Sequence, residues 1–215
     1  MHDACKLYLI TPPTIDLVLF TESLSRVFDA GEIACLQLRL KHYADDDVLR
    51  AAEQLMPICH RNNTSFIIND RPDLAKQAGA DGVHIGQEDA SYADARSCLG
   101  EHSIVGVTCH NSRHLALLAA EAGADYVAFG AFFPTDTKQA KTLANNGILK
   151  WWSEIIEVPC VAIGGITALN CLPIIQAGAD FIALMSGIWN HPEGPSTAVN
   201  EFIEIIASGV MKTQT

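Results

Sequence analysis

Basic residues are scarce in this sequence, which has 14 Lys and Arg against 25 Asp and Glu and a formal net charge of −11. Proteins that bind nucleic acid or anionic membranes usually carry an excess of positive charge that attracts phosphate groups. We therefore expect neither nucleic acid nor a membrane surface as a partner. The scarcity also makes any local group of basic residues informative, because few are available.

Long hydrophobic runs and closely paired cysteines are also absent. No apolar run approaches the roughly 20 residues of a membrane-spanning helix. Pro12, Pro13 and Asp16 interrupt the apolar segment near the start, so we do not expect a signal peptide. The seven cysteines include no CxxC pair, which favours reduced, buried thiols over disulfides. We therefore expect a cytoplasmic protein.

The composition is typical of one compact domain. The chain has 215 residues, of which 49% are hydrophobic and 18% are charged. A chain of this length and apolar content can bury a large core without dividing into several. We expect a single domain over residues 1–215.

A short motif, Ala-Gly-Ala-Asp, occurs three times, each time before an apolar run. It lies at 78–81, 122–125 and 177–180, and a weaker copy, Asp-Ala-Gly-Glu, lies at 29–32. The glycine is typical of a helix end, and the apolar run is typical of a strand that follows at once. A repeat every ~45–55 residues indicates recurring supersecondary units, here with two strand–helix pairs each. Each aspartate stands where a strand begins, which favours a structural role.

About eight apolar segments alternate with helical patterns, which predicts the α/β class and a single (β/α)8 TIM barrel. Within 34–41, three leucines alternate with three polar residues, so the two sets occupy opposite faces. In a barrel, Leu36, Leu38 and Leu40 would face the outer helices, and the polar residues would face the interior. A half-exposed edge strand would show the same alternation, but the repeats favour the barrel. The expected strands are 6–11, 34–41, 66–68, 82–86, 104–108, 126–130, 158–165 and 181–186.

Two aspartates end successive strands within the segment 66–89. Asp70 and Asp89 each follow an apolar run, and so short a strand–helix–strand unit implies a parallel pair. Both carboxylates then lie at the same edge of the sheet, which predicts a divalent cation site, with magnesium and a phosphorylated substrate. The alternative is that Asp70 only caps or turns the chain. Asp45 and Asp73 are expected to cap helices.

Groups suited to phosphate follow other strands. Chemistry in such barrels takes place at the C-terminal ends of the strands. Gly164 and Gly165 follow the seventh strand and Ser186 follows the eighth, which suits a phosphate bound by backbone N–H groups. The segment 134–147 is irregular and long enough to be a binding loop. Two anion sites beside a metal pair suggest one substrate with pyrophosphate and another with monophosphate; the cations available to them are Arg39, Lys41 and Lys138.

Six segments, in this order and spacing, resemble the thiamine phosphate synthase family, also called thiamine-phosphate pyrophosphorylase. Each segment alone is weakly specific, but together they extend over nearly the whole chain, from Lys6 to about Ile188. The resemblance implies that the protein joins hydroxymethylpyrimidine pyrophosphate to hydroxyethylthiazole phosphate and releases pyrophosphate. The segments are QLRLK (37–41), INDRPDLA (68–75), DGVHIGQED (81–89), GADYVAFG (123–130), FPTDTK (133–138) and VAIGGIT (161–167).

The resemblance also implies roles for individual residues. Asp70 and Asp89 match the family's Mg²⁺ ligands, and Thr108 lies beside the pyrimidine. The family's reaction is dissociative, so pyrophosphate leaves first and the thiazole nitrogen captures the resulting cation. Mg²⁺ and basic side chains, here Arg39, Lys41 and Lys138 as the implied catalytic residues, stabilise the leaving charge. The pyrophosphate site matches Gln37, Arg39, Lys41, Asn69 and Lys138, and the thiazole phosphate site matches Thr135, Thr137, Gly165, Met185 and Ser186.

Two residues depart from the family pattern. Ala131 stands where proline is usual, and Thr108 stands where serine is usual. Neither change removes a charge or a metal ligand. His84 is expected to be a hydrogen-bonded interior residue and not a catalyst. A zinc site built on Cys109, His110 and His114 lacks an evident fourth ligand.

Three other functions stay open at this point. A thiazole tautomerase of the same fold would carry a histidine at the position of Ala131 and would lack the acidic pair. A non-catalytic protein that binds thiamine precursors would tolerate the loss of Asp70 or Lys138. A Schiff-base aldolase would use Lys41 or Lys138. The expected partners are small phosphorylated substrates, and the sequence leaves open whether the chain forms a homo-oligomer.

Overall fold

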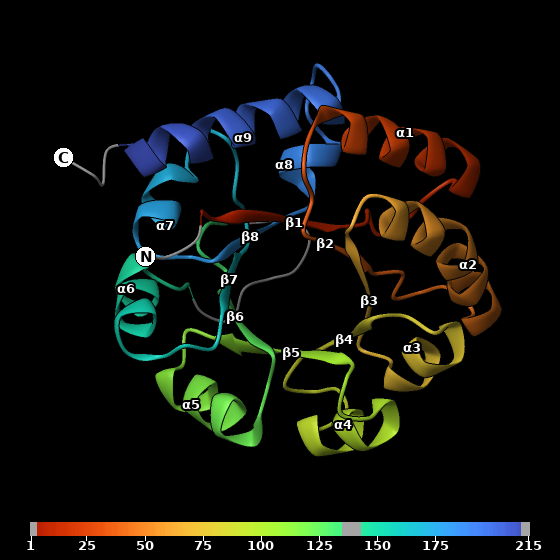
Figure 1. Cartoon of the computed structure of the whole chain (residues 1–215), viewed down its shortest axis with the longest axis horizontal. Coiled ribbons are helices and arrows are strands. Elements are labelled where there is room, and N and C mark those ends of the chain that lie inside the picture. The colour runs from red at the N-terminus through yellow and green to blue at the C-terminus, as the bar shows by residue number, and fades with distance from the viewer. Residues whose placement is uncertain (1–3, 135–142, 212–215) are drawn as a thin grey trace.

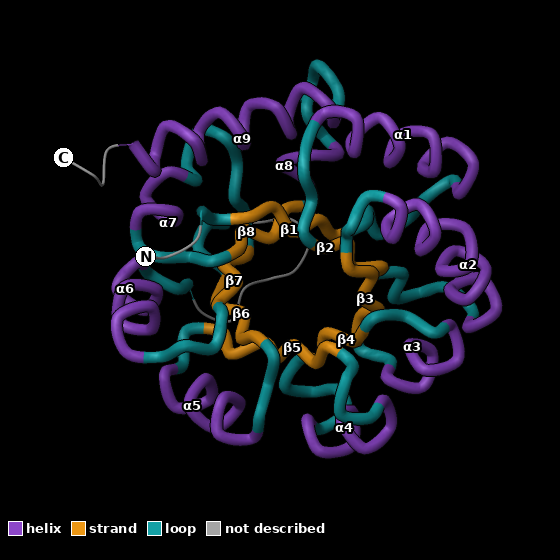
Figure 2. The backbone as a smooth tube through the Cα atoms, in the orientation of Figure 1, coloured by secondary structure: helices purple, strands orange, loops and turns teal. Residues whose placement is uncertain are grey.

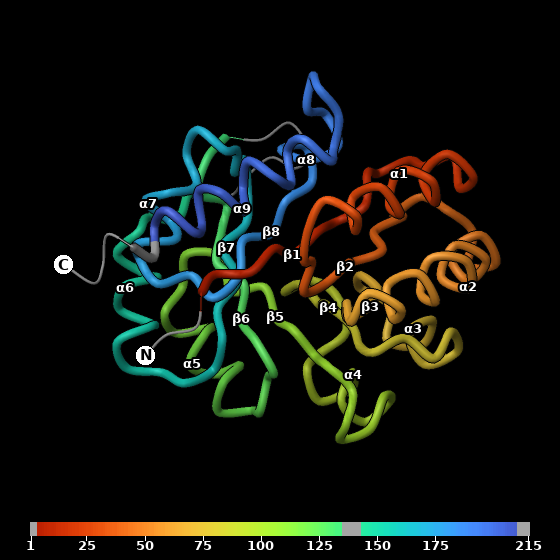
Figure 3. The backbone as a smooth tube through the Cα atoms, turned by 45° about the horizontal axis from the view of Figure 1, so that its top comes forward, coloured from red at the N-terminus to blue at the C-terminus, as the bar shows by residue number. Residues whose placement is uncertain are grey.

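Eight parallel strands form one closed barrel in the computed structural model, which describes residues 4–134 and 143–211. Their order around the barrel follows their order in the chain, and β8 pairs with β1 to close it (Figures 1 and 3). The predicted (β/α)8 TIM barrel is confirmed. The strands are β1 (Lys6–Ile10), β2 (Cys35–Leu38), β3 (Ser65–Asn69), β4 (Gly82–Ile85), β5 (Ile104–His110), β6 (Tyr126–Gly130), β7 (Cys160–Ile163) and β8 (Phe181–Leu184).

Helices surround the barrel on its outside (Figure 2). The first and last long helices, α1 and α9, pack against each other, so the two ends of the chain complete one ring. Within the described residues, no helix combines the length and apolar character needed to cross a membrane. The helices are α1 (Leu17–Ala30), α2 (Asp45–Arg61), α3 (Pro72–Ala78), α4 (Tyr92–Leu99), α5 (Arg113–Ala122), α6 (Asn146–Ile155), α7 (Leu172–Gln176), α8 (Ser186–Trp189) and α9 (Pro195–Met211).

Successive side chains of β2 and of the two residues after it face opposite sides of the sheet, where two separate apolar cores lie. Leu36, Leu38 and Leu40 belong to the large core between strands and helices. Gln37 points the other way and hydrogen-bonds inside the barrel, where a smaller core is formed by residues that include Ile67 and Val161. Because β2 pairs with both β1 and β3, it is not an edge strand. The expectation that the leucines face the helices is confirmed.

The repeated aspartates are structural. Each one immediately precedes an even-numbered strand, and its Oδ2 accepts a hydrogen bond from a backbone N–H at the start of the preceding strand. The weaker fourth copy lacks this device, because Ala34 occupies the equivalent position and bonds only through its backbone to Leu7. The three carboxylate–amide pairs are Asp81–Phe66 at 2.6 Å, Asp125–Val105 at 2.7 Å and Asp180–Cys160 at 2.8 Å.

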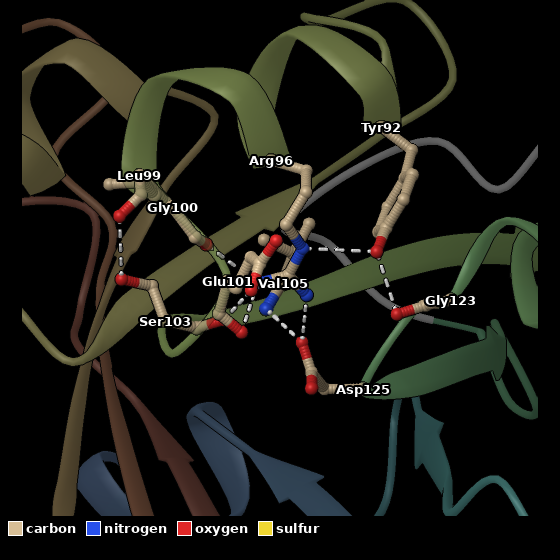
Figure 4. A network of polar contacts seen from close by, with 9 residues as sticks. All are labelled: Tyr92, Arg96, Leu99, Gly100, Glu101, Ser103, Val105, Gly123 and Asp125. Atoms are coloured by element: carbon tan, nitrogen blue, oxygen red, sulfur yellow. Dashed lines mark hydrogen bonds and ion pairs between the residues drawn. The ribbon is translucent and has the colours of Figure 1, made fainter.

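Arg96 extends one of these pairs into a network (Figure 4). Its guanidinium donates to Asp125 and to the backbone carbonyls of Gly100 and Ser103. It also donates to the hydroxyl of Tyr92, which in turn donates to a carbonyl in the next helix–strand turn. Helix α4 and the beginnings of β5 and β6 are thereby tied together at the N-terminal end of the barrel.

Two expected helix caps are wrong. Helix α2 begins at Asp45, with Ala44 as its N-cap, and helix α3 begins at Pro72. Asp45 and Asp73 instead accept hydrogen bonds from the guanidinium of Arg71, at 2.8 Å and 2.6 Å. Both aspartates lie within the first turn of their helices and not at the N-cap position, and their carboxylates form charge-assisted bonds with Arg71.

We expect Asp125→Asn to lower the free energy of unfolding by about 1–3 kcal/mol, because Val105 N–H and Arg96 lose a charged acceptor. Urea unfolding measures the change. Asp29→Asn is the control: Asp29 is exposed on α1, and its replacement should change stability by less than about 0.5 kcal/mol. Equal stability of the two variants would show that the Asp125 network is not a stabilising feature.

Candidate functional site

The C-terminal ends of the strands open into a cavity of about 270 Å³. Because all strands run in parallel, their last residues meet at this one mouth. A second hollow beside the mouth is bordered by some of the same residues, including Arg39, Lys41 and Gly165. Every strand contributes at least one residue to the cavity wall: Ile10, Gln37, Asn69, His84, Thr108, Gly130, Ile163 and Ala183.

The structure brings most of the predicted site residues together. Ten of them line the first cavity: Gln37, Arg39, Lys41, Asn69, Asp70, Asp89, Thr108, Gly165, Met185 and Ser186. Thr135, Thr137 and Lys138 lie outside the described residues. The individual roles of all thirteen stay predictions, because the geometry places side chains without a bound substrate.

An acidic pair lies at one side of the mouth. Burial and the neighbouring Asp70 raise the pKa of Asp89, whose carboxylate also accepts the backbone N–H of Gly86 at 2.9 Å. Burial opposes ionisation of Asp70, but hydrogen bonds from Lys41, Asp89 and Asn69 outweigh it and lower its pKa. The two shifts therefore differ in cause: Lys41 gives most of the stabilisation of the charged form of Asp70, whereas burial and the adjacent Asp70 charge disfavour the charged form of Asp89. A divalent cation between the two carboxylates would offset the effect of the Asp70 charge on Asp89.

Asp70 is held in place by its backbone and by Lys41. Its φ of 63° is in the left-handed region, which non-glycine residues rarely adopt and which is concentrated at functional sites. Its N–H donates to the carbonyl of His84 at 2.8 Å. Its Oδ2 lies 2.6 Å from Lys41 Nζ. The Asp70 carboxylate is therefore fixed both by its backbone conformation and by an ion pair.

The opposite side of the mouth is formed by close-packed backbone. Gly164 and Gly165 have φ values of +103° and +64°. A Cβ added to Gly165 would lie 2.5 Å from the carbonyl oxygen of Pro134, and one added to Gly164 would lie 2.4 Å from Ala131 Cβ. Only glycine fits both the conformation and the space. Met185 and Ser186 border the same part of the cavity.

A chain of buried polar side chains crosses the barrel beneath the cavity. It begins at Gln37 and passes through Tyr8, Tyr126 and His84 to Thr108, with each link between 2.7 and 2.9 Å. Burial lowers the pKa of His84 to about 4, so its imidazole is neutral at neutral pH. The expectation of a hydrogen-bonded interior histidine is confirmed. Tyr8 and Tyr126 were not predicted from the sequence, where they resemble ordinary strand residues 118 positions apart.

The residues considered for zinc do not converge. Cys109 is fully buried in the core between strands and helices, whereas His110 lines the cavity on the other face of β5. His114 is exposed on α5. Within the described parts of the chain, no three or more His, Cys, Asp or Glu side chains form a group that could hold a metal ion. A cation at Asp70 and Asp89 would therefore need further ligands from substrate or water.

Comparison with known proteins gives a consistent result. The family model described as "Thiamine monophosphate synthase" matches residues 7–188. A thiamine-phosphate synthase of Rhodospirillum centenum is 57% identical over 202 residues, which are 94% of this chain and 98% of the relative. One from Hyphomonas neptunium is 45% identical, with 94% of each chain covered. A solved thiamine phosphate pyrophosphorylase from Pyrococcus furiosus has a TM-score of 0.84 and 28% identity, covering 97% of this chain and 98% of the other.

Two alanine variants separate backbone conformation from close approach. Gly79 has a φ of +69°, close to that of Gly165, but a Cβ added there would meet no atom within 4 Å. We expect Gly79→Ala to lower the free energy of unfolding by about 1 kcal/mol, through its left-handed φ alone. Gly165→Ala should lower it by about 2–4 kcal/mol, because overlap with Pro134 adds to the same strain. Equal losses in denaturant titrations would contradict the close packing of this side of the mouth.

Proposed function

Because this chain belongs to the thiamine monophosphate synthase family, we propose that it joins hydroxymethylpyrimidine pyrophosphate to hydroxyethylthiazole phosphate. The products are thiamine phosphate and pyrophosphate. The observation that carries this proposal is the arrangement of the mouth, where the Asp70–Asp89 pair and two basic side chains face a glycine-lined wall across one cavity. Those groups suit two phosphorylated substrates bound side by side.

The pyrophosphate group would bind between the acidic pair and the basic side chains Arg39 and Lys41. Magnesium is commonly held by one or two carboxylates, with substrate phosphates and waters as its other ligands. Asp70 and Asp89 fit that description, because they supply two carboxylates and leave room for substrate in the cavity. When bound there, Mg²⁺ would neutralise charge on the pyrophosphate. Asn69 also lines the cavity, directly before Asp70 in the chain.

The reaction needs charge stabilisation more than proton transfer. The bond between the pyrimidine methylene carbon and the pyrophosphate oxygen breaks, and both electrons leave with pyrophosphate. The thiazole nitrogen then donates its lone pair to the methylene cation, and a C–N bond forms. No proton is gained or lost in either step. Arg39 and Lys41 would stabilise the developing negative charge, as fixed cations do in other transition states.

The thiazole phosphate would bind at the glycine-lined wall. Gly165, Met185 and Ser186 line the cavity, and at Gly165 no side chain covers the backbone. The family resemblance adds Thr135 and Thr137 to this site and Lys138 to the pyrophosphate site. Separate sites for the two anions would hold the thiazole nitrogen against the pyrimidine methylene. Holding two reactants in this way raises their effective concentration and so speeds the reaction.

The tautomerase alternative is disfavoured by the residues at the mouth. Ala131 lines the cavity and has no group that could transfer a proton. The acidic pair that a tautomerase would lack is present. A location in the cytoplasm is part of the proposal and is supported by the seven cysteines, which are all free thiols, six of them buried.

Removal of the metal should abolish the reaction. We expect EDTA to stop thiamine phosphate formation and added Mg²⁺ to restore it. Asp70→Asn and Asp89→Asn should each lower kcat by about 10²–10³-fold, a typical cost of losing one group that stabilises transition-state charge. Asp73→Asn is the matched control, because Asp73 belongs to the same motif but pairs with Arg71 outside the cavity. Full activity of both cavity variants in EDTA would exclude a metal at this pair.

Thr108 allows hydrogen bonding and shape to be tested separately. Its Oγ1 bonds to His84 Nε2 at 2.7 Å, and it lines the cavity. We expect Thr108→Ser to keep kcat/KM within a few-fold, because the hydroxyl is retained. Thr108→Val keeps the shape but leaves partners unpaired, so kcat/KM should fall by about 10–100-fold. Circular dichroism checks that each variant is folded. If Thr108→Val has the same kcat/KM as the wild-type protein, the Thr108 hydroxyl has no polar role in the reaction.

A further inference from the structure

The polar chain beneath the cavity has a direction, because each member can give only the protons it carries. Gln37 Nε2 lies 2.8 Å from Tyr8 Oη, and an amide nitrogen can only donate. Tyr8 therefore accepts this bond and retains its own proton for another partner. Its neighbours are Tyr126 Oη at 2.9 Å and the thiol of Cys35. A thiol sulfur is a weak acceptor, so Tyr8 donates to Tyr126.

The same reasoning continues to the far end. Tyr126 has accepted one hydrogen bond and donates its proton to His84 Nδ1 at 2.8 Å. A neutral imidazole that accepts at Nδ1 carries its proton at Nε2. His84 Nε2 thus donates to Thr108 Oγ1 at 2.7 Å. The proton of Thr108 is left to point elsewhere, and the cavity is the open direction.

The two ends of the chain consequently present opposite groups to the cavity. Gln37 uses its amide nitrogen below, which leaves its Oε1 as an acceptor, and Thr108 offers its hydroxyl proton as a donor. Both residues line the cavity, and Gln37 is only 3% exposed. The reverse order would require all five side chains to change together, from the orientation of the amide to the tautomer of the imidazole. Such chains are cooperative for this reason.

We propose that Tyr8, Tyr126 and His84 are positioning residues that fix the hydrogen-bond polarity of Gln37 and Thr108 and thereby select a 4-aminopyrimidine over its 4-oxo analogue. A 4-aminopyrimidine offers an exocyclic amine that donates and a ring nitrogen that accepts, which complements this polarity. The 4-oxo form offers a carbonyl that accepts and a ring N–H that donates. The inference rests on the proposed function, because it assumes that the pyrimidine ring binds between these two residues.

The mismatch with the oxo analogue should be large. The analogue's carbonyl would face Gln37 Oε1, acceptor against acceptor, and its ring N–H could be met only by the remaining lone pair of Thr108, which leaves the Thr108 proton without an acceptor. Sites built to hydrogen-bond a substrate can reject a poorly paired analogue by about 10⁴–10⁵-fold. We expect the wild-type protein to prefer the amino substrate by at least about 10³-fold in kcat/KM. If Tyr8 and Tyr126 only fill space, removing their hydroxyls should leave the amino-to-oxo ratio of kcat/KM unchanged.

The test uses Tyr126→Phe, Tyr8→Phe and the double variant, which keep ring volume and remove hydroxyls from the middle of the chain. Each is assayed with the thiazole phosphate, Mg²⁺ and either 4-amino or 4-oxo pyrimidinylmethyl pyrophosphate. Once the chain is cut, Gln37 and His84 can reorient, so kcat/KM for the oxo substrate should rise and the amino-to-oxo ratio should fall at least tenfold. The double variant should lose no more selectivity than either single variant. Tyr92→Phe, which removes a hydroxyl at the opposite end of the barrel, is the matched control and should keep the wild-type ratio.

The outcomes separate this inference from the proposed function. If the wild-type protein forms no thiamine phosphate from the amino substrate, the proposed function fails. If it forms thiamine phosphate but uses both pyrimidines equally, or if Tyr126→Phe keeps the wild-type ratio, only the inference is overturned.

A measurement on the unaltered protein does not depend on folding of the variants. Nitrogen-15 NMR should show His84 as the neutral tautomer protonated at Nε2, with the resonance assigned by its loss in His84→Gln. A proton on Nδ1 would overturn the polarity, whatever the variants do.

Discussion

The hydrogen bonds that join β8 to β1 are the constraint on which the rest of the structure depends. They close eight parallel strands in register, so every strand ends at the same mouth. Asp70 and Asp89 are neighbours because β3 and β4 pair directly, but Gly165, which follows β7, faces them across one cavity because the barrel is closed. An open sheet of the same strands would separate β1 from β8 and divide the site.

Carboxylates serve different purposes at the two ends of the barrel. At the N-terminal end, Asp81, Asp125 and Asp180 each accept a backbone N–H from a neighbouring strand and help to hold the strands together. At the C-terminal end, Asp70 and Asp89 lie close to each other and each affects the pKa of the other, and this is the pair that we propose binds a cation. The aspartates at the N-terminal end thus bind backbone between strands, whereas Asp70 and Asp89 line the cavity, where Asp70 pairs with Lys41.

Local patterns predicted much of this arrangement, and long-range contacts account for what they missed. The leucines of β2 and the repeated aspartates were predictable, because strand alternation and helix–strand turns involve residues close in sequence. The caps at Asp45 and Asp73 were wrong because each helix has its N-cap at an earlier residue, Ala44 and Arg71; the bond between Asp45 and Arg71, 26 positions away, has no local pattern. The contact between Tyr8 and Tyr126 joins opposite parts of the barrel interior and has no local pattern.

The central claim is that two phosphorylated substrates react with each other at this mouth. Phosphorus-31 NMR of the purified protein with both precursors and Mg²⁺ tests it directly, because each phosphate group has its own resonance. The account predicts that pyrophosphate and thiamine phosphate accumulate in equal amounts and that thiamine phosphate does not form when either precursor is omitted. Release of pyrophosphate without any thiamine phosphate in the complete mixture would contradict it.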